Sequence, residues 1–241
     1  RLLKLNFGIM CLHILLMSTF VALPGQLAAA GFPAAEHWKI YLVTMLISFV
    51  SVVPFIIYAE VKRKMKRVFV GCVALLLIAE IVLWGSGPHF WELVAGVQLF
   101  FLAFNLMEAL LPSLISKESP AGYKGTAMGI YSTSQFLGVA IGGSLGGWVD
   151  GLFDSQTVFL AGALLAMVWL LVASTMKEPR YVSSLRVEIP EEVDVSDALK
   201  QRLEAKEGVT EVLIVPEERS AYVKIDSKVT NRFEVEQALK A

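Results

Sequence analysis

Charged residues and cysteine are both scarce in this chain of 241 residues, of which 18% are charged and two are cysteine. Soluble domains usually contain about 25% charged residues and about 45–50% apolar residues. This sequence is 56% hydrophobic, with a mean hydropathy of +0.62, which disfavours a soluble enzyme. Cys11 and Cys72 lie in apolar runs without a neighbour at metal-ligand spacing. The sequence therefore indicates no disulfide framework, no metal site and no cofactor.

An excess of charge of either sign is also missing, because the formal net charge is −1. With no basic patch interleaved with aromatic residues, nucleic acid is not an expected partner. The charge is nevertheless uneven: residues 1–180 hold 12 basic and 9 acidic residues, whereas residues 181–241 hold 9 and 13. We therefore expect a transmembrane lobe in residues 1–180 and a cytoplasmic tail domain in residues 181–241.

Long apolar runs account for most of the first part. A bilayer core of about 30 Å requires about 20 apolar residues in a helix, and six runs qualify: 6–28, 38–60, 67–86, 90–116, 124–150 and 156–176. The first run resembles a signal peptide, but Asn6 and His13 interrupt it and no initiator methionine precedes it. We interpret it as a spanning helix of a chain that begins within a longer protein. The expected fold class is a membrane all-α lobe of six helices plus a small α+β domain.

Basic residues indicate the orientation of these helices. Eleven of the twelve basic residues in 1–180 lie at the two ends of this part or in alternate gaps between runs, and the twelfth, Lys39, lies just inside the second run. Cytoplasmic segments of membrane proteins are enriched in Lys and Arg. We therefore expect both ends of the chain to face the cytoplasm.

Ionisable side chains at membrane depth are costly and therefore indicate function. Glu108 lies in the fourth run, and Gln98, Asn105 and Glu108 fall within about 80° of one another on a helical wheel. We interpret this stripe as one wall of a water-filled cavity in which Glu108 exchanges a proton. The alternative is an interhelical hydrogen bond or a buried pair without a role in transport.

Two further runs carry isolated polar side chains. Asn6 and His13 are seven residues apart on one face of the first run, and an imidazole titrates near physiological pH. His13 is therefore a candidate for the proton pathway, with a structural hydrogen bond as the alternative. Glu80 stands alone among aliphatic residues in the third run, which favours a structural, hydrogen-bonded carboxyl.

The fifth run is rich in glycine. The spacing Gly138-x-x-x-Gly142-x-x-x-Gly146 predicts close packing against another helix backbone. Tyr131 and Gln135 share one side of this helix and are candidates for facing the cavity.

The connection between the second and third runs is strongly basic. Glu60, Arg63 and Arg67 in this connection either set the topology or form a cytoplasmic latch, in which Glu60 holds a basic residue or a helix end.

Residues 181–241 alternate in a different way. Period-2 patterns at 185–189, 209–215 and 221–225, with helical spacing at 195–203 and after Asn231, predict the order strand–helix–strand–strand–helix. This order is the start of a ferredoxin-like sandwich whose last strand is missing. The tail has no His, no Cys and no glycine loop for phosphate. We expect a regulatory or docking module or, alternatively, a stabilising appendage.

The motifs Gly125-Thr-Ala-Met-Gly-Ile-Tyr131 and Gly142-Gly-Ser-Leu-Gly-Gly-Trp148, on six runs with cytoplasmic ends, are similar to the carboxyl-terminal half of a major facilitator superfamily carrier. The resemblance covers essentially all 241 residues. It implies a multi-pass protein of a bacterial inner membrane that exports small amphipathic compounds against protons, by alternating access with a missing amino-terminal six-helix lobe. Its partners would be the substrate, protons and the lipid bilayer. A different class of function, a membrane-anchored sensor or scaffold that displays the tail, stays open.

The resemblance also assigns roles to residues. The family lines its central cavity with the first and fourth helices of each lobe, which places Asn6, His13, Gln98, Asn105 and Glu108 there. Residues of the fifth helix, Tyr131 and Gln135, would flank the cavity. The basic connection lacks the glycines of the family's cytoplasmic signature. The tail also resembles heavy-metal-associated domains but lacks their Cys-x-x-Cys loop.

Overall fold

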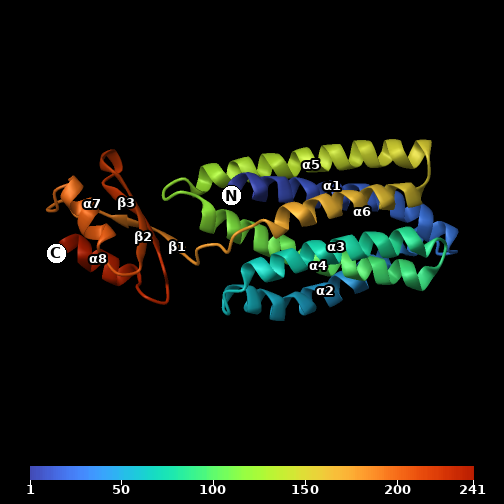
Figure 1. Cartoon of the computed structure of the whole chain (residues 1–241), viewed down its shortest axis with the longest axis horizontal. Helices are drawn as coiled ribbons and strands as arrows, with labels where there is room; N and C mark the ends of the chain where they lie inside the picture. The colour runs from blue at the N-terminus through green and yellow to red at the C-terminus, as the bar shows by residue number, and fades with distance from the viewer. The chain divides into compact units, whose positions relative to one another are not determined.

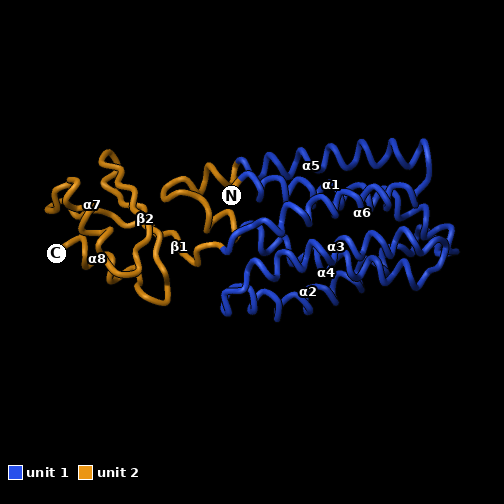
Figure 2. Tube along the Cα trace, in the orientation of Figure 1, with its two compact units in different colours: residues 1, 3–112, 130–178 blue, residues 2, 113–129, 179–241 orange.

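A computed structural model describes all residues from 1 to 241 and divides into two compact units (Figure 2). Unit 1 contains residues 1, 3–112 and 130–178, and unit 2 contains residues 2, 113–129 and 179–241. The connection between the fourth and fifth long helices therefore belongs to the same unit as the tail.

Each of the six apolar runs forms a long helix in the structure, so this part of the predicted fold class is confirmed. They are α1 (Leu2–Ala29), α2 (His37–Glu60), α3 (Met65–Ser86), α4 (Phe90–Glu118), α5 (Lys124–Leu152) and α6 (Ser155–Ser174), with a short 3-10 turn, η1 (Ala34–Glu36), before α2. Five of them are long and apolar enough to cross a membrane. The exception is α5, because its glycine, serine and glutamine residues lower its hydropathy.

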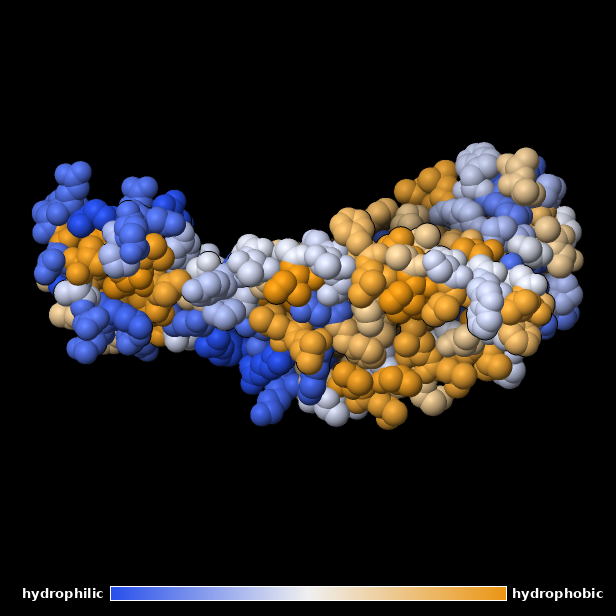
Figure 3. All heavy atoms as spheres, turned by 90° about the horizontal axis from the view of Figure 1, so that it is seen from above, coloured by the Kyte–Doolittle hydropathy of each residue, from blue (hydrophilic) through white to orange (hydrophobic).

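Much of the face of these helices that Figure 3 shows is apolar. Only 22% of the apolar stretch of α2 is buried, and side chains such as Leu46 and Val50 are 55% and 75% exposed. A helix that is apolar on all sides is typical of contact with lipid. Within unit 1, α3 packs along α6 (Figure 1), where Trp169 meets Phe69 edge-on and lies over Gly8 of α1.

The tail forms a three-stranded antiparallel sheet with two helices, as predicted. Its elements are β1 (Ser183–Glu188), α7 (Asp197–Glu204), β2 (Val209–Val215), the 3-10 turn η2 (Pro216–Glu218), β3 (Ser220–Ile225) and α8 (Arg232–Lys240). The strand order is β1-β3-β2, and β3 is antiparallel to both neighbours. This is the split βαβ arrangement expected for the start of a ferredoxin-like domain.

One face of this sheet forms the core of the tail. Val187 and Val223 from the strands are buried against Leu199 of α7 and Val235 of α8. The opposite face carries Tyr222 and Lys224, and it contacts the connection between α4 and α5 in the same unit. Both faces of β3 are therefore covered.

Candidate functional site

Three glycines place α5 directly against α1. A Cβ atom on Gly138, Gly142 or Gly146 would lie 2.5 Å, 2.6 Å or 2.7 Å from a backbone atom of α1. No side chain fits at such distances, so the close packing predicted from the spacing is confirmed. Gln135 lies one turn before Gly138, which brings its amide to the position of His13 on α1.

Three predicted site residues from three helices meet at this point. His13 Nε2 lies 3.3 Å from Glu108 Oε1 of α4 and 3.2 Å from Gln135 Nε2 of α5. The imidazole is 4% exposed, and its other nitrogen, Nδ1, lies 3.1 Å from the backbone oxygen of Ile9. Phe104 packs edge-on against the imidazole at 5.8 Å between ring centres. His13 is therefore held by its own helix and points one nitrogen at Glu108.

The hydrogen bonds of His13 determine what the pair with Glu108 can do. A backbone oxygen only accepts, so Nδ1 carries a hydrogen and donates it to Ile9. In a neutral imidazole, Nε2 is then an acceptor that faces the carboxylate of Glu108, which is also an acceptor. The 3.3 Å contact becomes a hydrogen bond only when one additional proton resides on the imidazole or on the carboxyl group. The contact therefore has the geometry of a hydrogen bond that requires one shared proton.

Three polar atoms of predicted site residues have no hydrogen-bond partner. Asn6 Oδ1, Glu108 Oε1 and the hydroxyl of Tyr131 are buried and make no hydrogen bond in the structure. Buried polar atoms normally have partners. Tyr131 also lies within electrostatic range of Glu108. These predicted site residues therefore retain the capacity to bind water or a polar group of a ligand.

Gln98 and Asn105, the two other predicted site residues of α4, form hydrogen bonds with α2. Gln98 Nε2 donates to Ser48 Oγ at 3.0 Å and to the backbone oxygen of Thr44 at 3.2 Å. Asn105 Nδ2 donates to the sulfur of Met45 at 3.0 Å. They are not hydrogen-bonded to His13 or Glu108, and their place in a substrate cavity stays a prediction.

Glu80 of α3 has the interhelical hydrogen bond that its isolated position predicted. Thr19 of α1 donates to Glu80 Oε1 at 2.5 Å, and the carboxyl group is fully buried. A Cβ on Gly162 of α6 would lie 2.9 Å from Glu80 Oε2, so only glycine leaves room for this carboxyl. Thr19 carries no sequence signal that marks it as the partner.

The predicted latch residues lie at the turn between α2 and α3. Glu60 is the last residue of α2, and Arg63 follows with a positive φ of 55°. Arg67, in the first turn of α3, donates to the hydroxyl of Tyr58 at 3.0 Å. The latch itself stays a prediction.

A polar cluster in unit 2 was not predicted from the sequence. Lys224 of β3 is 0% exposed, and its Nζ donates to the backbone oxygens of Ser116 and Lys117, both at 2.9 Å, at the end of α4. Glu211 of β2 accepts from the backbone N–H of Ala121 at 2.8 Å. Burial lowers the pKa of Lys224 below its ordinary value of 10.5. We call Lys224, Glu211 and residues 116–122 the tail clasp.

A glycine in the tail clasp leaves room for close contact with the sheet. Gly122 has a φ of +82°, and a Cβ there would lie 2.5 Å from Leu213 and 3.4 Å from Tyr222. The alternation of residues in β3 places Tyr222 and Lys224 on the face opposite Val223. From the sequence pattern alone, this second face is expected to be exposed to solvent. No local signal indicates that a distant connection covers this face.

Comparisons with known proteins relate the chain to proteins that are named as transporters. Residues 185–241 match the YajR YAM domain family. The inner membrane transport protein YajR of Escherichia coli (strain K12) is 80% identical over 240 residues, which are 100% of this chain and 53% of that protein. An uncharacterized transporter of Buchnera aphidicola is 37% identical over 58% of this chain and 36% of its own length.

A third relative is named as an MFS-type transporter. An uncharacterized MFS-type transporter of Pseudomonas aeruginosa is 31% identical over 107 residues, which are 44% of this chain and 26% of that protein. The chain spans about half the length of the curated relative that it matches from end to end. These relatives are named as transporters, and none of these names indicates a catalytic activity.

Proposed function

Since the chain corresponds to the carboxyl-terminal half of an MFS-type transporter, we propose that it forms one lobe of a proton-coupled carrier of a bacterial inner membrane. Residues 1–180 form the transmembrane lobe, and residues 181–241 form the tail domain. An amino-terminal lobe completes the carrier, and the two lobes rock about a site near the midplane. Both ends of this chain face the cytoplasm, in agreement with the distribution of its basic residues.

The contact between His13 and Glu108 carries this proposal. With a proton bound, the pair is an imidazolium–carboxylate or an imidazole–carboxyl hydrogen bond, and α1 and α4 are held together. Without the proton, the lone pair of His13 Nε2 faces the negative charge of the Glu108 carboxylate. Their repulsion is strong because the local dielectric constant is low. Release of the proton therefore favours separation of α1 from α4, and proton binding favours closure.

Gln135 adapts to both states of the pair. Its amide group donates to His13 Nε2 when the imidazole is neutral, and its oxygen accepts from the same nitrogen when the imidazole is charged. The contact of α5 with α1 thus persists while the proton moves. Asn6, Gln98, Asn105 and Tyr131 supply the polar groups of the substrate cavity, and aromatic rings such as Phe104 supply its apolar wall.

The substrates in this proposal are small amphipathic compounds that leave the cell in exchange for protons. An apolar wall with few polar groups suits such compounds. The tail domain acts on the lobe through the tail clasp, which fixes the connection between α4 and α5 and so stabilises or regulates the helix that carries Glu108.

The experiment uses everted membrane vesicles that contain the full-length protein, with ethidium as the transported probe. We expect Glu108→Gln to abolish proton-driven ethidium accumulation, because the neutral carboxamide cannot exchange a proton. Exchange of ethidium between the two sides without a proton gradient should persist, which separates coupling from folding. Glu92→Gln, an exposed carboxyl on the same helix, is the matched control and should transport like the parent.

Two outcomes contradict the proposal. Proton-driven accumulation at the parental level in Glu108→Gln removes the proton role from this residue. If vesicles with the parent protein take up no more ethidium than empty vesicles, this class of substrate is excluded. That result would favour the alternative function, a membrane anchor for a sensor domain.

A further inference from the structure

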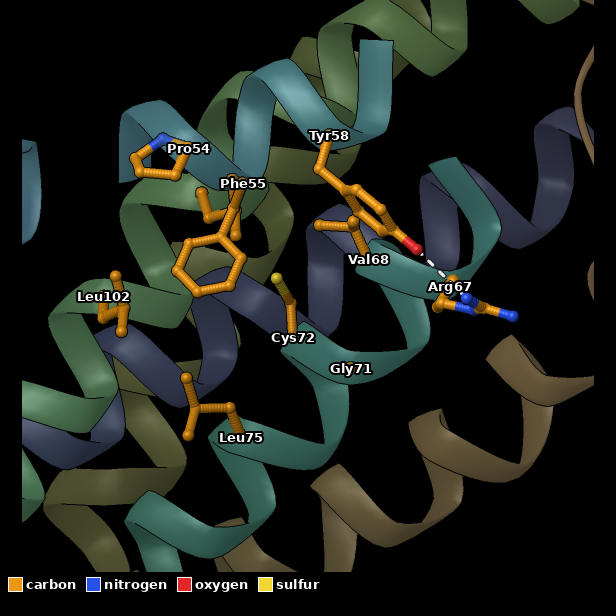
Figure 4. A pocket seen from close by; sticks show the side chains of 10 residues that line it. Pro54, Phe55, Tyr58, Arg67, Val68, Gly71, Cys72, Leu75 and Leu102 are labelled. Atoms are coloured by element: carbon orange, nitrogen blue, oxygen red, sulfur yellow. Dashed lines mark hydrogen bonds between the residues drawn. The ribbon is translucent and has the colours of Figure 1, made fainter. Parts of the chain in front are cut away.

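An apolar groove of about 460 Å³ opens at the ends of α2 and α3 that flank the basic connection (Figure 4). Apolar side chains of three helices line it, among them Phe55 of α2, Leu75 of α3 and Leu102 of α4. Phe55 is 45% exposed, so the groove is accessible from the outer surface of the helices. It is separate from the residues that contact His13 and Glu108.

One end of the groove is polar. Arg67 lies there and donates to the hydroxyl of Tyr58 at 3.0 Å (Figure 4). The other lining groups are apolar side chains, a glycine and the thiol of Cys72. From Arg67 to Leu75 the groove follows α3 for eight residues, or roughly 12 Å at 1.5 Å per residue.

The connection that leads to Arg67 is rich in basic residues. Lys62, Lys64 and Lys66 precede Arg67 within six residues of the chain. None of these three lysines forms an ion pair in the structure, and Arg67 contacts only the neutral phenol of Tyr58. A planar guanidinium with unused N–H groups is well suited to bind a phosphate through two parallel hydrogen bonds.

We propose that this groove binds an anionic phospholipid. The phosphate of the headgroup accepts hydrogen bonds from Arg67 and is attracted by the adjacent lysines, while one acyl chain lies along α3 between Phe55 and Leu102. Basic residues next to membrane helices attract anionic lipids of the cytoplasmic leaflet. The combination of an apolar groove with cations at one end only fits a lipid better than a soluble phosphate, which needs no groove.

Gly71 provides the space for the acyl chain. It lines the groove one turn after Arg67, and a Cβ added there would meet no atom within 4 Å. Gly71→Leu therefore fills the groove without displacing the backbone. Gly85, near the end of the same helix, also has nothing within 4 Å and does not line the groove, so Gly85→Leu is a matched control.

The test measures phospholipid retained by the full-length protein, by native mass spectrometry after purification from nanodiscs of equal phosphatidylglycerol and phosphatidylethanolamine. We expect the parent to retain phosphatidylglycerol preferentially. Arg67→Gln should lower its retention roughly five-fold, the effect of one basic residue near an anionic lipid surface. Gly71→Leu should lower retention of the same lipid, whereas Gly85→Leu should retain the parental amount.

Further arms separate the sources of the phosphate. Millimolar inorganic phosphate should fail to displace the retained lipid, because it cannot occupy the apolar part of the groove. Equal retention of both lipids, displacement by phosphate, or the same retention in Gly71→Leu as in Gly85→Leu would each overturn the proposal. So would a cross-link from the groove to a second copy or to another segment of the protein, which would show a different occupant.

Discussion

Two carboxyl groups lie in apolar helices of unit 1, and their partners distinguish them. Glu80 is fully buried, accepts from Thr19, and is enclosed by Gly162. The side chain of Glu108 is 36% exposed and faces the imidazole of His13. Only the second group is partly exposed and has a basic side chain as its partner. Depth in the helix alone does not separate the two.

We therefore expect Glu80→Gln to leave proton-driven ethidium transport in vesicles at the parental level, since the carboxamide oxygen still accepts from Thr19. Glu80→Ala should lower the free energy of unfolding by about 1–3 kcal/mol, because the Thr19 hydroxyl loses its buried partner. Thermal unfolding of the full-length protein in detergent measures the second effect. Folded Glu80→Gln protein that no longer couples transport to protons would assign the proton role to Glu80 as well.

The sequence singled out three residues that meet in the structure, but it did not indicate their contacts. His13, Glu108 and Gln135 each stood out as a polar residue in an apolar run, because membrane depth makes such residues costly. That they meet depends on how three helices pack, which no local pattern encodes. Lys224 carried no signal at all, because its burial comes from residues more than one hundred positions earlier in the chain.

At the scale of elements, the glycines of α5 determine where the site forms. Gly142 lies against the backbone of Ile14, and Gly138 lies against Met10 and His13. Because glycine removes the side chain, α5 approaches α1 closely enough for Gln135 to reach the imidazole. The same glycines lower the hydropathy of α5, so this close contact is made by the one long helix that composition does not identify as a membrane span.

Gly142→Ala should separate α5 from α1, because its Cβ would lie 2.6 Å from the backbone oxygen of Ile14. We expect a loss of about 1–3 kcal/mol in the free energy of unfolding, as for other overpacked sites. Gly143→Ala is the matched control, because a Cβ on Gly143 meets nothing within 4 Å. Thermal unfolding of both variants in detergent makes the comparison. Equal unfolding temperatures would show that this contact does not hold the two helices together.

The order of elements was predictable because it depends on periodicity within short segments. The apolar runs gave the six helices, and alternation in the tail gave its three strands and two helices. The covered second face of the sheet was not predicted. Alternation reports that Val223 and Lys224 point to opposite faces, but it does not report what lies on either.

At the scale of the whole molecule, the resemblance to the carboxyl-terminal half of a major facilitator carrier is confirmed by the comparisons. A single lobe cannot alternate access by itself, because the proposed cavity lies between two lobes. The tail clasp joins segments that are far apart in the sequence, the tail domain and the connection that leads from α4 to α5.

Lys224→Met should open the tail clasp in the full-length protein. The variant keeps an unbranched side chain, shorter by one atom, but leaves the carbonyl groups of Ser116 and Lys117 without their donor, at a cost of about 1–3 kcal/mol if they stay buried. Hydrogen–deuterium exchange should therefore rise at residues 116–122, where the N–H of Ala121 is otherwise bound by Glu211. Lys228→Met, at an exposed lysine of the same domain, should leave exchange unchanged.

The pH dependence of the tail clasp gives an independent measurement. Because burial lowers the pKa of Lys224 in the folded tail, the unfolded chain binds more protons between that lowered pKa and about 10.5. The lysine therefore makes folding more favourable as the pH rises through this window, and protonation at lower pH opposes it. Protection of residues 116–122 should increase in the parent as the pH rises toward about 10.5, relative to Lys224→Met. An equal change in both proteins would mean that Lys224 stays protonated in the tail clasp throughout and that its charge is fully compensated there.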